Sequence, residues 1–141
     1  MPDLSVSEEK VAFLIEKSRE FDAKEAGVDP DSGSNPSDDD DIDVLQDGGD
    51  PVAAELSSFI RAMNEDEQLD LVALMWLGRG DGTIEEWDEL RGRAVEARAE
   101  YTNPRTETAR YLLGEPMLSD YLAEGLDEFG LSWSDERTTP V

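Results

Sequence analysis

The residues best suited to chemistry lie in one glycine-rich loop. Positions 78–82 read Gly-Arg-Gly-Asp-Gly, which places a cation and a carboxylate side by side in a tight turn. Arg79 is one of 12 basic residues in an acidic chain, so it either pairs with a nearby acid and fixes the loop or meets an anionic group of a partner. The sequence favours the first interpretation. Arg79, Asp81 and the nearby Trp87 are the candidate binding residues.

The same loop resembles the second half of an EF-hand, because Asp-Gly-Thr-Ile follows at 81–84. An EF-hand needs oxygen ligands at loop positions 1, 3, 5 and 12 and glycine at position 6. With Gly82 at position 6, Leu77 and Arg79 occupy positions 1 and 3. Two ligands are therefore missing, and a helix cap at Thr83 is the better interpretation.

Carboxylates elsewhere carry little specific information. Asp-x-Asp-x-Asp at 39–43 has the first three EF-hand spacings, but Val44 stands where glycine is needed. Asp66 and Asp70 share a helix face, as many acids must in a chain that is a quarter Asp and Glu. General acid–base chemistry would need one carboxylate in a dry pocket with a raised pKa, and the sequence locates no such pocket. We predict no catalytic residue, no metal site and no cofactor.

The chain has no His and no Cys. This excludes disulfides, Cys-ligated metal sites, Ser-His-Asp triads, Cys-His dyads and His-containing di-iron bundles. The run Gly-x-Gly-x-Gly at 78–82 has neither a preceding strand nor the lysine of a P-loop. The residues and motifs that most enzymes use for catalysis are thus missing, and the sequence favours a protein that is not an enzyme.

Charge is the most unusual property of the chain. Its 141 residues carry a formal net charge of −24, with 16 acidic and 4 basic residues over 1–50 and 20 and 8 over 51–141. Such a charge repels nucleic acid phosphates and anionic lipids, so no direct nucleic acid or membrane partner is expected. The acidity fits a highly solvated surface, an adaptation to salt, or a face that docks a basic partner, for example by mimicking DNA.

Targeting signals are not evident. The start of the chain lacks a basic and an apolar signal region, and the longest apolar run, Leu71–Leu77, has seven residues. A membrane span needs about 20. We therefore expect a cytoplasmic protein.

Apolar side chains recur at helical spacing along most of the chain, which predicts an all-α single-domain bundle of five to seven helices. A capping box at Ser5 and Glu8, another from Asn64, and glycines at 78, 114 and 130 set the boundaries. The helix over 65–77 is apolar nearly all round and is expected to be central. We expect helices over about 7–26, 51–62, 65–77, 84–101, 105–113 and 116–129.

Residues 29–50 differ in composition, with nine Asp and several turn-forming residues. Their composition fits either a disordered acidic linker or an acidic loop with a short helix over about 38–46, and we favour the second because Asn35 or Ser37 can cap such a helix and Asp38–Asp41 would lie in its first turn. We expect residues 1–133 to form one domain and residues 134–141 to be a frayed tail.

The pattern as a whole resembles a family of small, acidic, mostly proteobacterial proteins of unknown function. The resemblance rests on Leu-Val-Ala-Leu-Met-Trp-Leu-Gly-Arg-Gly-Asp at 71–81 with Glu-Trp at 86–87, and on Tyr-Leu-Leu-Gly at 111–114. It covers about residues 4–133. It implies that residues 29–50 belong to the fold, but it supplies no activity and no catalytic residues.

Three hypotheses on function follow. The first is a non-enzymatic interaction or adaptor module, whose partner is a protein, either basic or a second copy of this chain. It predicts an apolar surface patch of more than a few hundred Å². The second is a ligand-binding protein or enzyme that uses carboxylates and Arg79 beside the 78–82 loop. The third is an acidic DNA mimic.

Overall fold

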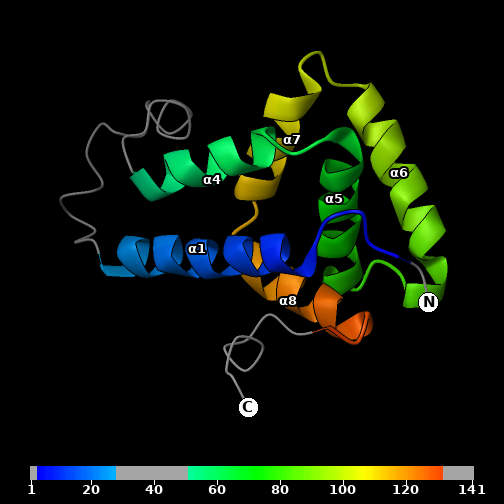
Figure 1. Ribbon diagram of the computed structural model, residues 1–141, viewed down its shortest axis with the longest axis horizontal. Helices are drawn as coiled ribbons and strands as arrows, with labels where there is room; N and C mark the ends of the chain where they lie inside the picture. The colour runs from blue at the N-terminus through cyan, green and yellow to red at the C-terminus, as the bar shows by residue number, and fades with distance from the viewer. Residues whose placement is uncertain (1–2, 28–50, 132–141) are drawn as a thin grey trace.

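The computed structural model describes residues 3–27 and 51–131, which form an all-α bundle (Figure 1). The predicted fold class is thereby confirmed. The predicted loop over 29–50, its short helix and the tail over 134–141 lie outside the described residues. Those that are described contain no strand, and their helices are α1 (Glu8–Gly27), α4 (Pro51–Arg61), α5 (Glu65–Arg79), η2 (Ile84–Glu86, a 3-10 turn), α6 (Trp87–Ala99), α7 (Pro104–Leu113) and α8 (Leu118–Glu128).

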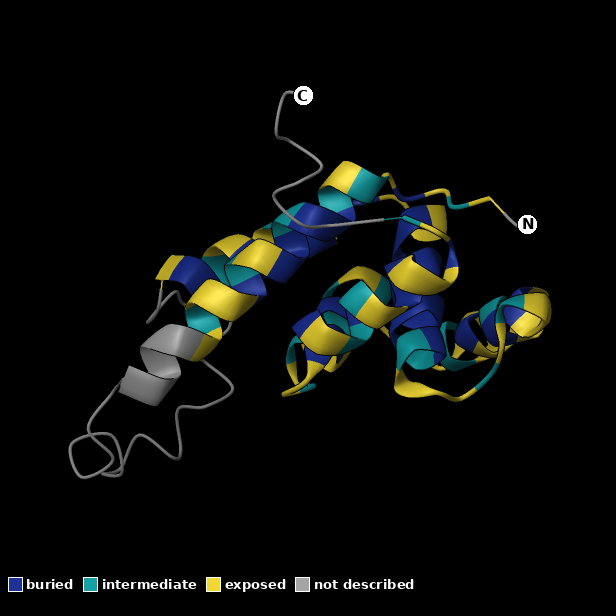
Figure 2. Ribbon diagram, turned by 90° about the horizontal axis from the view of Figure 1, so that it is seen from below, coloured by how far each residue is buried: buried dark blue, intermediate teal, exposed yellow. Residues whose placement is uncertain are grey.

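Helix α5 is the central element, as predicted. It packs against α6, α7 and α8, and nearly all of its side chains from Glu67 onward are buried. Figure 2 shows buried residues along the inner surfaces of the bundle and exposed residues along its outside. A helix that is apolar on every side needs neighbours on every side, and α5 has them.

The C-terminus of α5 lies two residues beyond the predicted one. Gly78 was expected to stop the helix, but the helix continues to Arg79. Gly80 is the residue with positive φ (97°), and Asp81 N–H donates to the Trp76 carbonyl over 3.0 Å. This is a Schellman ending, which requires a left-handed residue and favours glycine. The rule that a helix ends at glycine predicted the end at Gly78, whereas the helix ends at Gly80, two residues later.

Gly78 has a different role, at the crossing of α5 and α8. A Cβ atom on Gly78 would lie 1.8 Å from the Tyr121 carbonyl oxygen, and one on Gly125 would lie 2.6 Å from the Leu74 carbonyl oxygen. The two glycines, one on each helix, therefore allow the backbones to approach closely. No side chain fits between them.

The N-terminus of α5 has the predicted capping box. Asn64 Oδ1 accepts from Glu67 N–H over 2.8 Å, and Glu67 Oε1 accepts from Asn64 N–H over 3.0 Å. The other oxygen of Glu67 pairs with Lys10 Nζ over 2.5 Å, which ties α1 to the start of α5. The pKa of Glu67 is lowered, first by the hydrogen bond from Lys10 and then by that from Asn64.

Replacement of Glu67 by glutamine tests this contact. Glutamine keeps the capping box but offers Lys10 no charge, so E67Q should lower the free energy of unfolding by about 0.5–1 kcal/mol at neutral pH. The folded pKa of Glu67 lies below its usual value of 4.5. The stabilisation is therefore full above that value and is lost as the pH falls through the folded pKa. Urea unfolding at pH 7 and at about pH 3 should show the gap between E67Q and wild type closing; an unchanged gap contradicts the assignment.

Helix α6 starts later than predicted. The expected helix over 84–101 is a turn of 3-10 helix, η2, followed by α6 from Trp87. Thr83 N–H donates to Glu86 Oε1 over 2.9 Å, so the predicted start signal at Thr83 acts on η2. Helical spacing predicts an apolar stripe along this helix, made of Ile84, Trp87, Leu90, Ala94, Val95, Ala97 and Tyr101. The prediction is wrong for Val95, which is 46% exposed. Figure 1 shows α6 along one flank of the bundle, beside α5.

The remaining helices match their predicted ranges within two residues. Helix α8 ends with a second Schellman motif, in which Gly130 has a φ of 76° and Leu131 N–H donates to the Leu126 carbonyl over 2.9 Å. Helix α1 is capped by Ser7, whose Oγ accepts from Lys10 N–H over 3.1 Å. The predicted cap at Ser5 is wrong, because α1 begins at Glu8 and Ser7 is the residue before it, while Ser5 N–H donates to the carboxylate of Asp70.

Candidate functional site

The structure brings Arg79 and Asp81 together. Arg79 donates from Nε and Nη2 to Asp81 Oδ2 over 2.9 and 2.6 Å, and its Nη1 lies 3.8 Å from Glu115 Oε1. The hydrogen bond to Asp81 is the first cause that raises the pKa of Arg79. The predicted pairing of Arg79 with a nearby acid is thus present, and it fixes the loop after α5. Asp81 gives its Oδ2 to this pair.

Sequence reasoning missed the residues that surround this pair. Trp76 belongs to the helix that was predicted to be central, yet it is only half-buried, and its indole N–H donates to Tyr111 Oη over 2.9 Å. The guanidinium of Arg93 lies 5.8 Å from the centre of the Trp76 ring and donates to the Asp81 carbonyl over 3.4 Å. These residues come from α5, α6 and α7. Their separations of 17 to 35 positions leave no local signal that could have grouped them.

Trp87 lies apart from this cluster. It is 2% exposed, and its ring meets Phe129 edge-on with 4.8 Å between the ring centres. Trp87 also forms part of the inner wall of a groove of about 630 Å³ between the N-terminal segment and the start of α6. This groove, the acidic groove below, is lined by Asp3, Ser5, Ile84, Glu85, Trp87, Asp88 and Arg91.

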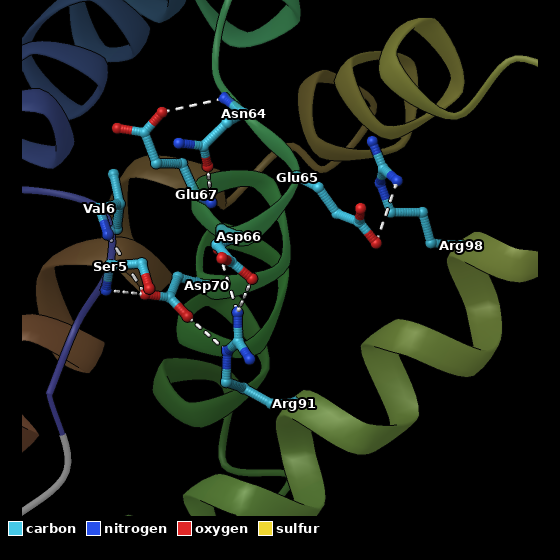
Figure 3. Close-up of polar contacts among 9 residues, drawn as sticks. All are labelled: Ser5, Val6, Asn64, Glu65, Asp66, Glu67, Asp70, Arg91 and Arg98. Atoms are coloured by element: carbon cyan, nitrogen blue, oxygen red, sulfur yellow. Dashed lines mark hydrogen bonds and ion pairs between the residues drawn. The ribbon is translucent and has the colours of Figure 1, made fainter.

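The acidic groove has an unbalanced charge. Arg91, its one described cation, donates from Nε to Asp70 Oδ1 over 2.6 Å and lies 3.5 Å from Asp66 Oδ1 (Figure 3). Asp3, Glu85 and Asp88 form no ion pair within the described residues. The groove therefore presents three unneutralised carboxylates beside the apolar side chains of Ile84 and Trp87.

The wall of the groove is held in place by Asp70. This carboxylate is 1% exposed and accepts hydrogen bonds from the backbone N–H groups of Ser5 and Val6, the latter over 3.2 Å (Figure 3). Together with Arg91 they use both of its oxygens. A buried carboxylate is tolerated when it is paired and hydrogen-bonded in this way. The N-terminal segment is thereby fixed against α5.

Within the described ranges no three acidic side chains come close enough to hold a metal ion. The pKa of Asp22 is raised, first by burial and then by Asp120. Asp22 lines a different cavity, of about 260 Å³, between α1, α4 and the loop before α8. The described helices also include none that is long and apolar enough to cross a bilayer.

Fold and groove together define an acidic all-α bundle with an anionic groove at the start of α6. The chain belongs to the family described as "Protein of unknown function (DUF3775)", whose model matches residues 53–131, more than half of the chain. No curated protein matches the chain, and no solved structure does. The matched region is shorter than the resemblance suggested. It contains Ile84, Glu85, Trp87 and Asp88, whereas Asp3 lies outside it.

Proposed function

We propose that this protein is a non-enzymatic interaction module that binds a basic segment of another protein in the acidic groove. The observation that carries the proposal is the set of three unneutralised carboxylates, Asp3, Glu85 and Asp88, around a groove with an apolar inner wall. A lysine or arginine side chain fits such a site, because its stem can lie on Ile84 while its charged head reaches the carboxylates.

The charge of the whole chain supports a basic partner over a second copy. Two copies would each bring a net charge of −24 and repel one another, whereas a basic partner is attracted from a distance. The same field speeds association and makes it sensitive to salt.

The proposal rests on charge and not on an apolar surface. The described residues expose three large apolar side chains, Val95, Tyr111 and Met117, which belong to α6, α7 and the turn before α8. The large patch that we expected of an adaptor is therefore not seen in the described part of the chain. A charge-based contact with little apolar burial predicts modest affinity and fast exchange.

A labelled arginine-rich nonapeptide is a direct probe, with binding followed by fluorescence anisotropy. The double variant E85Q/D88N should weaken binding about tenfold, since each exposed charge pair contributes up to about 1 kcal/mol. The matched control is E124Q/D127N, which removes two exposed acids with the same spacing from α8. It changes the net charge equally and should leave most of the affinity.

Equal losses in the two double variants would show that the peptide senses net charge alone, which contradicts a specific groove. A pull-down with the tagged wild-type chain, at low and at high salt, extends the test to native partners. We expect a basic protein that is released at high salt. Recovery of no specific protein, together with tight retention of a metabolite, would overturn the proposal in favour of a small-molecule function.

A further inference from the structure

A hollow in the surface between α4 and α7 has a charge opposite to that of the chain. The two helices pack against each other (Figure 1). The hollow has a volume of about 350 Å³, which is within the range of pockets that hold small molecules. This site, the arginine hollow below, is lined by Ser57, Arg61, Asn103, Thr106 and Arg110. The lining thus contains two cations and no acid, in a chain that is a quarter Asp and Glu.

The arginines at this hollow have no carboxylate partner. Arg61 and Arg110, together with the neighbouring Arg105, are exposed and form no ion pair within the described residues. Six cations elsewhere in the described ranges do pair with Asp or Glu. Because the chain has 36 acidic and 12 basic residues, a shortage of acids does not explain three guanidinium groups without a counter-charge at one place.

Helices α4 and α7 hold these groups in position. Arg61 Nε donates to Ser57 Oγ over 3.3 Å, which directs the side chain along the last turn of α4. Arg105 Nη1 donates to the Arg61 carbonyl over 3.1 Å, so a second guanidinium lies at the end of the same helix. Arg110 reaches the hollow from the last turn of α7. The C-terminus of a helix carries only about half a negative charge, which leaves the cluster positive.

The start of α7 adds polar donors to the hollow. Asn103 is the residue before this helix, but its side chain makes no capping hydrogen bond. The first N–H groups of a helix have no partner within the helix, and the positive end of the helix dipole favours an anion there. The amide of Asn103 and the hydroxyl of Thr106 therefore supply donors beside the two lining arginines.

The charge and the number of donors indicate which anion fits. Arg61 and Arg110 supply two positive charges, and the planar guanidinium binds phosphate oxygens through paired N–H donors. A carboxylate offers two acceptor oxygens and one charge. A phosphate monoester offers three terminal oxygens and a charge of about −1.5 to −2 at pH 7. The hollow therefore matches phosphate better than carboxylate.

We propose that the arginine hollow binds a small phosphate monoester with a polar body, such as a sugar phosphate. The body is polar because every side chain that lines the hollow carries a polar group. The net charge of −24 repels nucleic acids and anionic membranes along their whole length, whereas a compact dianion meets mainly the arginines next to it. The hollow shares no lining residue with the acidic groove, so this proposal is independent of the proposed function.

Glucose 6-phosphate is the probe, with glucuronate and glucose as controls of similar size that carry one negative charge or none. Titration followed by backbone amide signals in ¹H–¹⁵N NMR should show saturable shifts at Ser57, Thr106 and Arg110 with glucose 6-phosphate. Glucuronate should bind about tenfold more weakly, since it has one charge and one acceptor oxygen fewer. Glucose should give no shifts. Equal binding of glucuronate and glucose 6-phosphate would overturn the proposal, as would the absence of saturable shifts with the phosphate ester.

Inorganic phosphate separates the ester from the free ion. If the hollow holds the polar body as well as the phosphate group, inorganic phosphate should bind more weakly than glucose 6-phosphate. Equal affinities would show that the body makes no contact, and would contradict the assignment of an ester.

A second arm uses the variant R110Q, which removes a lining guanidinium that forms no ion pair among the described residues. It should weaken the binding of glucose 6-phosphate about tenfold. The matched control is R93Q, because Arg93 is also an exposed arginine without an ion pair in the described ranges, but it does not line the hollow. R93Q should leave most of the affinity. Equal losses in the two variants would show a response to net charge alone and contradict the site.

Discussion

Replacement of Gly78 by alanine is expected to lower the free energy of unfolding by about 3 kcal/mol or more. The added Cβ would lie 1.8 Å from the Tyr121 carbonyl oxygen and 2.6 Å from its carbonyl carbon. These are backbone atoms of α8, which cannot rotate away as a side chain can. The two helices must therefore separate, and the core around their crossing loses its packing.

Gly125 lies on α8, at the same crossing of α5 and α8. Its Cβ would meet the Leu74 carbonyl oxygen at 2.6 Å and the Leu74 side chain at 2.9 Å. Gly125→Ala should also destabilise, but less than Gly78→Ala, because part of the clash falls on a side chain. Once the helices have separated, the second substitution adds little, so the double variant should be less destabilised than the sum of the two.

Gly92 provides the control for both variants. It lies within α6, it is exposed, and a Cβ there would meet no atom within 4 Å. Gly92→Ala should raise the free energy of unfolding by about 0.5–1 kcal/mol, because alanine loses less backbone entropy in a helix. Urea unfolding of the three variants is the measurement. A loss below 1 kcal/mol in Gly78→Ala would contradict the close approach of α5 and α8.

The two roles of glycine explain where sequence reasoning failed. Apolar spacing predicted all six described helices, because burying an apolar stripe is a local property of the pattern. Gly78 and Gly80 both fit the rule that a helix ends at glycine. Only the position of α8, which is about 40 residues further along the chain, shows that Gly78 serves a helix crossing and that Gly80 ends the helix.

In the candidate site, too, contacts between residues close in sequence were predictable and contacts between distant residues were not. The pair Arg79 and Asp81 lies within one loop, so its contact follows from short separation and opposite charge. Trp76, by contrast, finds its partner Tyr111 on another helix, and Asp70 finds Arg91 21 positions away. Asp66 and Asp70 share a helix face, yet one is exposed and the other buried. Their difference is set by the N-terminal segment that covers Asp70, and no helical pattern encodes that.

Asp70→Asn should produce the second large loss, of about 3 kcal/mol. Asp70 Oδ2 accepts from the backbone N–H groups of Ser5 and Val6, while Oδ1 accepts from Arg91 Nε. An asparagine has the same shape but carries two N–H donors in place of one oxygen. Either orientation of its amide therefore places a donor against a donor, and Arg91 loses its buried counter-charge.

Asp66→Asn is the matched control, because Asp66 meets the same arginine from the same helix. Its side chain is 71% exposed and 3.5 Å from Arg91 Nη2, so its loss should be at most about 1 kcal/mol. Urea unfolding compares the two variants. Similar losses would show that Arg91 is held by charge in general and not by the buried carboxylate.

The two variants should also differ in function, if the acidic groove is the binding site. Asp70 fixes Ser5, which lines the groove next to Asp3, whereas Asp66 forms no hydrogen bond or ion pair with the described residues of the N-terminal segment. Asp70→Asn should therefore speed amide hydrogen exchange at Ser5 and Val6 and weaken the arginine-rich peptide, although both variants remove one negative charge. A peptide affinity that falls equally in both would assign the binding to net charge. A fall in peptide affinity that is confined to Asp70→Asn would show that the N-terminal segment must be fixed against α5 before the carboxylates of the groove can bind the peptide.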